Sequence, residues 1–349
     1  MTIEGNAGGA VEFDSTTSGS AVDTHQASVI RAPKASKIRR FGPWAVPIAL
    51  VILCVVFESL NRQFLSLSNL QTIVGTVALP SIVAGGLTIT LVVNQFDLSI
   101  EAIAGFATIA VAVLNVSAGI PIIFAILITL VLGMLIGLVN GLFVGYLGLA
   151  ALVVTIGMQS LLQGFQFTIS PSSGISSGIS LGFVNFARSG IAGIPTVFVM
   201  ALGILLLLWI ILTRTRLGRE MRAVGGSIEA ARYAGLNVRR ITLIAFVITA
   251  LTCAAAGVLF TGQQANVYPL QGLTVLLQSY AACFIGATMF RVGEFNIWGT
   301  AVGCVLAQVI SNGLLLVNVS SYTVYFFQGG ILISAVLLAR LVIGASRTV

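Results

Sequence analysis

Long apolar runs constrain this chain more than any other feature of its sequence. A helix needs roughly 20 predominantly apolar residues to cross about 30 Å of hydrocarbon. Runs of this kind lie near 44–60, 70–93, 98–116, 121–145, 149–169, 194–213, 241–260, 272–289, 297–317 and 322–341. With 57% hydrophobic and 8% charged residues, the chain falls far outside soluble usage. The sequence therefore predicts an all-α, polytopic transmembrane helical bundle of about ten spans over residues 44–349.

Basic residues flank these runs instead of spreading along the chain. One group precedes the first run and comprises Arg31, Lys34, Lys37, Arg39 and Arg40. The segment 213–240 carries seven arginines and two glutamates. Because arginine and lysine in short loops are held on the cytoplasmic side, both regions are expected there, and Arg340 and Arg347 predict a cytoplasmic carboxyl terminus. This placement favours membrane lipid, and not nucleic acid, as the partner of the positive charge.

The first 43 residues differ in composition from the rest. The first 30 are rich in Gly, Ser and Thr and include four acids, so they offer little apolar surface to offset the entropy lost on ordering. We expect residues 1–43 to form a disordered cytoplasmic tail with a basic end next to the membrane.

The missing residue types exclude several kinds of chemistry. The only histidine is His25, and the only lysines are Lys34 and Lys37, all before the first apolar run. No histidine-based catalytic or metal site is therefore expected within the membrane, and no Walker A lysine is available. We expect no catalytic residue, metal or cofactor in this chain. If ATP drives the protein, another chain must hydrolyse it.

Two apolar runs share a pattern of small residues. The fourth run contains Gly133, Gly137, Asn140 and Gly141, and the ninth contains Gly299, Gly303, Asn312 and Gly313. Small residues four apart allow helices to approach closely. Equivalent runs five spans apart, running in opposite directions, predict a five-plus-five inverted repeat. Chance similarity between two glycine-rich helices is the alternative.

Asp97 and Glu101 are acids next to an apolar run, four residues apart on one helix face. The preferred interpretation is that Asp97, with Ser99 as a second candidate, caps the third span at the cytoplasmic surface. The alternative is a gating or ion-coupling pair formed by Asp97 and Glu101, as an ion-coupled secondary transporter would need.

Amide side chains are the candidates for a translocation path for a neutral polar solute. Gln159, Gln163 and Gln166 lie at positions i, i+4 and i+7 of the fifth run, and Asn140 and Asn312 lie on the repeated pair. The alternative is that these amides join helices by hydrogen bonds.

Three segments of the chain carry a recognisable pattern: VVNQFDLSIEAIAGF (92–106), GLVNGLFVGYLGLAALVVTIGMQSLLQG (137–164) and TRTRLGREMRAVGGSIEAARYAGLNVRR (213–240). In sequence and in order they resemble the integral membrane subunits of ribose, xylose and arabinose type ABC importers. This chain departs from the family at Asn94, Gln95 and Glu101, where glycines are usual, and at 287–292, where the family is glycine-rich.

The resemblance implies a function for the short surface helix that we predict over residues 227–235. It implies that a cytoplasmic ABC ATPase subunit, which binds ATP and Mg, docks there. The coupling residues it implies are Glu229, Ala230, Ala231, Arg232 and Gly235. It further implies an extracytoplasmic sugar-binding protein, a second permease copy or paralogue, a monosaccharide or related polyol as substrate, and the bacterial cytoplasmic (inner) membrane.

Overall fold

The computed structural model describes residues 37–170, 174–191, 193–271, 275–290 and 293–320, together with residues 323, 326, 327, 329, 330, 333, 334 and 337. Residues 1–36 of the predicted tail, most of the predicted span 322–341, and Arg340 and Arg347 lie outside the described residues. The segment 37–43, which we expected to belong to the tail, is the start of a helix.

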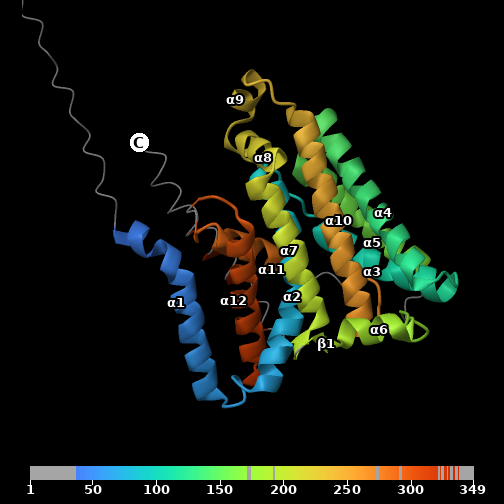
Figure 1. The fold of residues 1–349 in the computed structure, drawn as a ribbon, viewed down its shortest axis with the longest axis vertical. Coiled ribbons are helices and arrows are strands. Elements are labelled where there is room, and N and C mark those ends of the chain that lie inside the picture. Colours follow the sequence, from blue (N-terminus) through green and yellow to red (C-terminus); the bar gives the residue numbers. More distant parts are fainter. Residues whose placement is uncertain are drawn as a thin grey trace, which may run out of the picture. The chain divides into compact units, whose positions relative to one another are not determined.

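Helices make up almost the whole of the described chain (Figure 1). The α-helices are α1 (Lys37–Leu60), α2 (Leu67–Val92), α3 (Ile100–Ala112), α4 (Ile122–Gly141), α5 (Ala151–Ile169), α6 (Leu181–Arg188), α7 (Thr196–Arg214), α8 (Arg216–Gly226), α9 (Ile228–Tyr233), α10 (Val238–Gln264), α11 (Val275–Gly286) and α12 (Ile297–Leu316). Two π-helical turns, η1 (Val113–Ser117) and η2 (Leu142–Tyr146), extend α3 and α4, and β1 (Gly190–Ile191) pairs antiparallel with β2 (Ile194–Pro195).

Seven helices of the described chain are long and apolar enough to cross a membrane. They are α2, α3 with η1, α4 with η2, α5, α7, α10 and α12. The all-α polytopic prediction is therefore confirmed. The run predicted at 272–289 contains α11, whose 12 described residues correspond to about 18 Å at 1.5 Å per residue, shorter than the seven long helices. Its apolar composition persists after Gly286, but the backbone turns there.

α2 and α10 form the centre of the fold, and their small residues allow other helices to pack closely. A Cβ atom at Gly257 of α10 would overlap the backbone of α3 at Ala104. Threonine hydroxyls join the same helices: Thr249 donates to the Gly86 carbonyl at 2.7 Å, and Thr261 donates to the Thr108 carbonyl at 3.0 Å. Such contacts replace the hydrophobic driving force that lipid does not supply.

The packing of the glycine-rich helices follows the reciprocal pattern that an inverted repeat predicts. α3 and α4 pack on α10, whereas α11 and α12 pack on α2. The directions are also opposite. η2 ends α4 where α10 begins, since a Cβ at Gly145 would lie 2.7 Å from the Arg239 carbonyl oxygen. α12 begins near that end. The Trp298 ring, in its first turn, has its centroid 6.4 Å from that of Trp209, which lies in the last two turns of α7.

Replacing Gly137 with alanine is expected to destabilise the fold by about 1–3 kcal/mol, because the core at this point has no space. The new Cβ would lie 2.7 Å from the Ala250 Cβ and 2.7 Å from the Phe246 carbonyl oxygen. The control is Gly203→Ala on α7, where the Cβ would meet nothing within 4 Å. Thermal unfolding in detergent should show a lower midpoint for Gly137→Ala only. Equal midpoints would contradict close packing of α4 on α10.

Candidate functional site

The arginine-rich segment 213–240 connects α7 to α10 and forms one end of the helical bundle, which we call the loop end (Figure 1). The predicted short helix is confirmed as α9. Ser227 caps it, since its hydroxyl accepts a hydrogen bond from the Ala230 amide at 3.2 Å. Gly235 follows the helix with a φ of +76°, a conformation that favours glycine.

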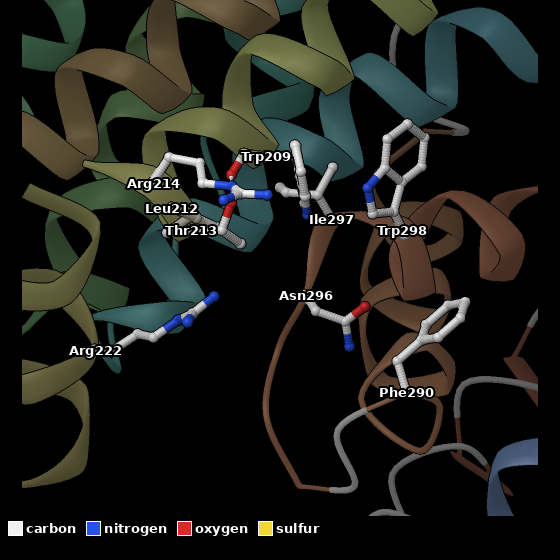
Figure 2. A pocket seen from close by; sticks show the side chains of 9 residues that line it. All are labelled: Trp209, Leu212, Thr213, Arg214, Arg222, Phe290, Asn296, Ile297 and Trp298. Carbon is white, nitrogen blue, oxygen red and sulfur yellow. Dashed lines mark hydrogen bonds between the residues drawn. The ribbon is translucent and has the colours of Figure 1, made fainter.

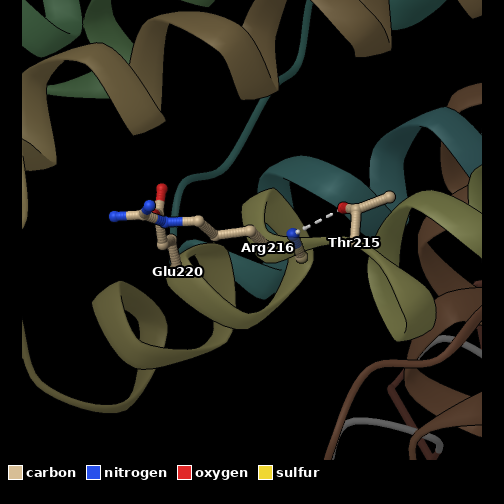
Figure 3. A network of polar contacts seen from close by, with 4 residues as sticks. Thr215, Arg216 and Glu220 are labelled. Carbon is tan, nitrogen blue, oxygen red and sulfur yellow. Dashed lines mark hydrogen bonds and ion pairs between the residues drawn. The ribbon is translucent and has the colours of Figure 1, made fainter.

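A second helix in this segment, α8, was not predicted. Thr215 caps it by accepting from the Gly218 amide at 3.2 Å, and Arg216 pairs with Glu220 at 2.7 Å (Figure 3). Met221 and Val224 are fully buried beside Val93 and Leu212. This apolar spacing was the signal for α8, but it lies among arginines and glycines that obscured it.

α8 lies directly against the end of α2. A Cβ atom at Gly225 would overlap the Val92 carbonyl oxygen and lie 3.5 Å from the Val93 Cα. The chain turns immediately afterwards at Asn94, whose φ is +59°. Asparagine tolerates this left-handed conformation better than most residues. A movement of α8 would therefore displace the segment that joins α2 to α3.

Most of the predicted coupling residues are exposed on α9. Glu229, Ala230, Arg232 and Gly235 are exposed. Ala231 is the exception: it is 3% exposed and belongs to the cluster that includes Met221 and Val224. Tyr233, which we did not predict, is 93% exposed. An aromatic residue within an otherwise small and charged helix was the signal for it.

Asp97 is buried, and not at a surface as we expected. It is 0% exposed, and its Oδ1 accepts from the Ser99 amide at 2.9 Å and from the Ser99 hydroxyl at 2.6 Å. Ser99 occupies the N-cap position of α3 without a capping side-chain bond. Ser99 therefore stands at the predicted capping position, but its hydroxyl bonds to Asp97 and not to an amide of the helix, and Asp97 lies two residues before that position. Their bonds stabilise the turn that precedes α3.

Other helices hold this turn in place. The Asn140 amide of α4 donates to the Ser99 hydroxyl at 3.0 Å, and the Tyr280 hydroxyl of α11 donates to the Asp97 carbonyl at 2.9 Å. The Leu98 amide donates to the Thr155 hydroxyl of α5 at 3.1 Å. The turn between α2 and α3 is thus fixed to α4, α5 and α11 at once. A change at the end of α2 would reach three further helices through it.

Glu101 has a separate partner. Its Oε1 accepts from the Gln159 side chain at 2.7 Å, which joins α3 to α5. Within the described residues, no hydrogen bond or ion pair joins Glu101 to Asp97. The two acids therefore act in separate contacts. No cluster of three or more metal-ligating acids, cysteines or histidines occurs in the described part of the chain.

The amides predicted for a translocation path mostly bond to other elements. Asn312 exchanges hydrogen bonds with Asn69 of α2 at 3.0 and 3.1 Å. Gln166 is buried and accepts from the Leu270 amide at 3.0 Å. Gln163 is half-buried on the same helix. Gln159 and Asn140 also form hydrogen bonds to other helices. Four of the five amides therefore bond to another element of the fold. A role for them in the translocation path stays a prediction.

Comparison with known proteins assigns the chain to a family. A family model described as "Branched-chain amino acid transport system / permease component" matches residues 69–336. The D-allose transport system permease protein AlsC of Escherichia coli K12 is 31% identical over 294 residues, which cover 84% of this chain and 90% of that protein. The ribose import permease protein RbsC of Bacillus subtilis is 30% identical over 308 residues, covering 87% and 93%.

A third relative is the galactose/methyl galactoside import permease protein MglC of Salmonella typhimurium, 30% identical over 311 residues that cover 84% of this chain and 93% of that protein. No solved structure matches the chain. The match to the family model, over residues 69–336, includes the arginine-rich segment. The chain therefore belongs to this family of ABC importer permease components, and within the family it is a carbohydrate importer permease.

Proposed function

We propose that this chain forms the translocation path for a monosaccharide or related polyol in an ATP-binding cassette importer. The observation that carries the proposal is similarity along most of the chain to permeases named for allose, ribose and galactose. The family description names branched-chain amino acids, a substrate class without the hydroxyl groups of a sugar. The sugar assignment rests on the relatives, and the experiment below includes both classes.

A separate ATPase subunit supplies the energy in this proposal. It docks on α9, where Glu229, Ala230, Arg232 and Tyr233 are exposed, and on the exposed Gly235 that follows the helix. ATP and Mg are bound by that partner, and this chain performs no hydrolysis and holds no cofactor. Closure of the ATPase would push α9 and then α8, and α8 contacts the end of α2 through Gly225.

The complete importer has further parts. A second copy of this chain, or a paralogue, completes the path, and an extracytoplasmic binding protein delivers the sugar at the end opposite the loop end. We place the protein in a bacterial cytoplasmic membrane, with the arginines of the loop end and both termini in the cytoplasm. The asymmetry of arginine between the two ends supports this orientation.

The test begins with purification of the full chain in mild detergent from its native host and identification of the proteins that accompany it by mass spectrometry. ATP hydrolysis by the complex is then measured with ribose, allose, galactose or leucine and the matching binding protein. We expect a Walker-containing ATPase to copurify and a sugar to stimulate it. Stimulation by leucine alone would refute the sugar assignment but leave the assignment as an ABC importer in place. If no ATPase copurifies, the assignment as an ABC importer is refuted.

Neutralising both acids tests whether an ion gradient has any part in transport. In Asp97→Asn with Glu101→Gln, each new amide oxygen can still accept the hydrogen bond from Ser99 or Gln159. We expect ATP-driven uptake in liposomes to remain, with a loss of about fivefold at most, equivalent to about 1 kcal/mol. Uptake that follows a sodium or proton gradient in the parent chain and disappears in the variant would contradict the proposal.

A further inference from the structure

A cavity of about 470 Å³ opens at the loop end between α7 and α8 on one side and the start of α12 on the other (Figure 2). Its walls include Thr213, Arg214 and Arg222 and, across the cavity, Phe290, Asn296 and Trp298. α7 ends at Arg214 and α12 begins at Ile297, so the cavity lies at the level where membrane-spanning helices end. Tryptophans are enriched at this level because their amphipathic rings suit the headgroup region.

Within the described residues, the positive charge in this cavity has no acidic partner. Figure 2 shows the guanidinium groups of Arg214 and Arg222 directed into the space between the two walls. Arg214 also lies over the Trp209 ring, 5.5 Å from its centroid. No acidic residue of the described chain lines the cavity, and neither arginine makes an ion pair within the described residues. Glu220, the acid of α8, pairs with Arg216 instead. Two arginines without a counter-charge favour an anion.

Asn296 does not compete for that anion. Its Oδ1 accepts from the Gly299 amide at 2.7 Å as the cap of α12, and its Nδ2 donates to the Gly286 carbonyl at 3.2 Å. The Thr213 hydroxyl likewise donates to the Trp209 carbonyl at 2.6 Å. Both polar side chains are therefore engaged within the protein. The recognition of an anion falls to the two guanidinium groups.

An apolar groove adjoins the cavity and extends into the spans. Its volume is about 300 Å³, and it shares Phe290 and Trp298 with the cavity as walls. The remaining walls come from α7, α12 and α2 and are apolar apart from Ser81. A soluble anion would use the cavity and leave this groove without a role. A molecule with an anionic head and a hydrocarbon tail would fill both.

We propose that this site binds an anionic phospholipid, with the headgroup phosphate between Arg214 and Arg222 and an acyl chain along the groove between α7 and α12. Guanidinium groups bind phosphate oxygens through paired, charge-assisted hydrogen bonds. Basic pockets between membrane helices at the bilayer surface suit such headgroups. The lipid would join α7 and α8 to α12. This inference concerns lipid binding alone and does not depend on the substrate or on the ATPase.

The test uses the full chain reconstituted in nanodiscs of phosphatidylcholine containing a minor fraction of phosphatidylglycerol, followed by detergent exchange and mass spectrometry of retained lipid. The pocket variant is Arg214→Gln with Arg222→Gln. The control is Arg219→Gln with Arg232→Gln, which removes the same charge from exposed positions outside the cavity. We expect phosphatidylglycerol retention to fall about thirtyfold in the pocket variant only, that is, about five- to sixfold for each arginine. Equal losses in both variants would overturn the site.

Two further arms separate a lipid from a free phosphate. Inorganic phosphate added during the exchange is expected to leave retention unchanged, because it cannot occupy the groove. Ala301→Phe, which fills the groove, is expected to lower phosphatidylglycerol retention while both arginines remain. Displacement of the lipid by inorganic phosphate, or full retention in a folded Ala301→Phe chain, would overturn the proposal. If Ala301→Phe does not fold, the arginine pair and the phosphate arm decide the question.

Discussion

Replacing Gly225 with alanine is expected to abolish the stimulation of ATP hydrolysis by sugar in the assembled importer. The added methyl group would overlap the Val92 carbonyl oxygen, so α8 must move away from the end of α2. Overpacking of this kind costs about 1–3 kcal/mol. α8 is the only helix between α7 and the exposed α9. If α8 is displaced, a movement of the ATPase on α9 is no longer transmitted to the membrane-spanning helices. The measurement is ATPase activity of the purified complex with and without sugar and binding protein.

The neighbouring glycine provides a matched control. A Cβ atom at Gly226 would meet nothing within 4 Å, although Gly226 belongs to the same helix and is the next residue in sequence. Gly226→Ala should keep sugar stimulation and bind the ATPase as the parent does. The proposed route through α8 and α2 is contradicted if Gly225→Ala folds, binds the ATPase and is still stimulated by sugar.

Replacing Tyr233 with alanine is expected to weaken binding of the ATPase about 30-fold or more. The side chain is 93% exposed on α9, beside the exposed Arg232. An aromatic side chain that becomes buried at the centre of an interface commonly contributes 2 kcal/mol or more, that is, roughly 30-fold in affinity. Affinity can be measured by titrating the purified ATPase onto the full chain in nanodiscs.

The control for Tyr233 lies elsewhere in the chain. Tyr268 follows α10 and is 49% exposed, about as suited to an interface by its chemistry. Tyr268→Ala should leave ATPase affinity unchanged, because Tyr268 lies at the far end of α10 from the arginine-rich segment. Equal affinity of the Tyr233→Ala and parent chains would show that α9 does not carry the contact.

Hydrophobic length and capping chemistry made much of the fold predictable. The predicted runs at 70–93, 149–169 and 297–317 match α2, α5 and α12 within three residues at each end. The short helix predicted over residues 227–235 corresponds to α9, which the Ser227 hydroxyl cap begins and the left-handed Gly235 follows, and both are local features. Local signals of this kind do not depend on which helices later become neighbours.

Features that depend on tertiary contacts were not predictable. α11 is apolar enough for a span but ends at Gly286, whose packing against Gly299 of α12 only the folded chain reveals. Ala231 is as small as its exposed neighbour Ala230, yet it packs inward with Met221 and Val224 of α8. Asp97 looked like a surface cap, but it is buried in a turn that α4 contacts through Ser99 and α11 contacts through the Asp97 carbonyl.

The most direct test of the central claim is sugar uptake into liposomes that contain this chain, with or without the copurified ATPase and in the absence of any ion gradient. The account predicts uptake only when the ATPase, ATP and the sugar-loaded binding protein are all present, and no uptake with the Gly225→Ala chain. Uptake by this chain alone, driven by a sodium or proton gradient, would contradict the account.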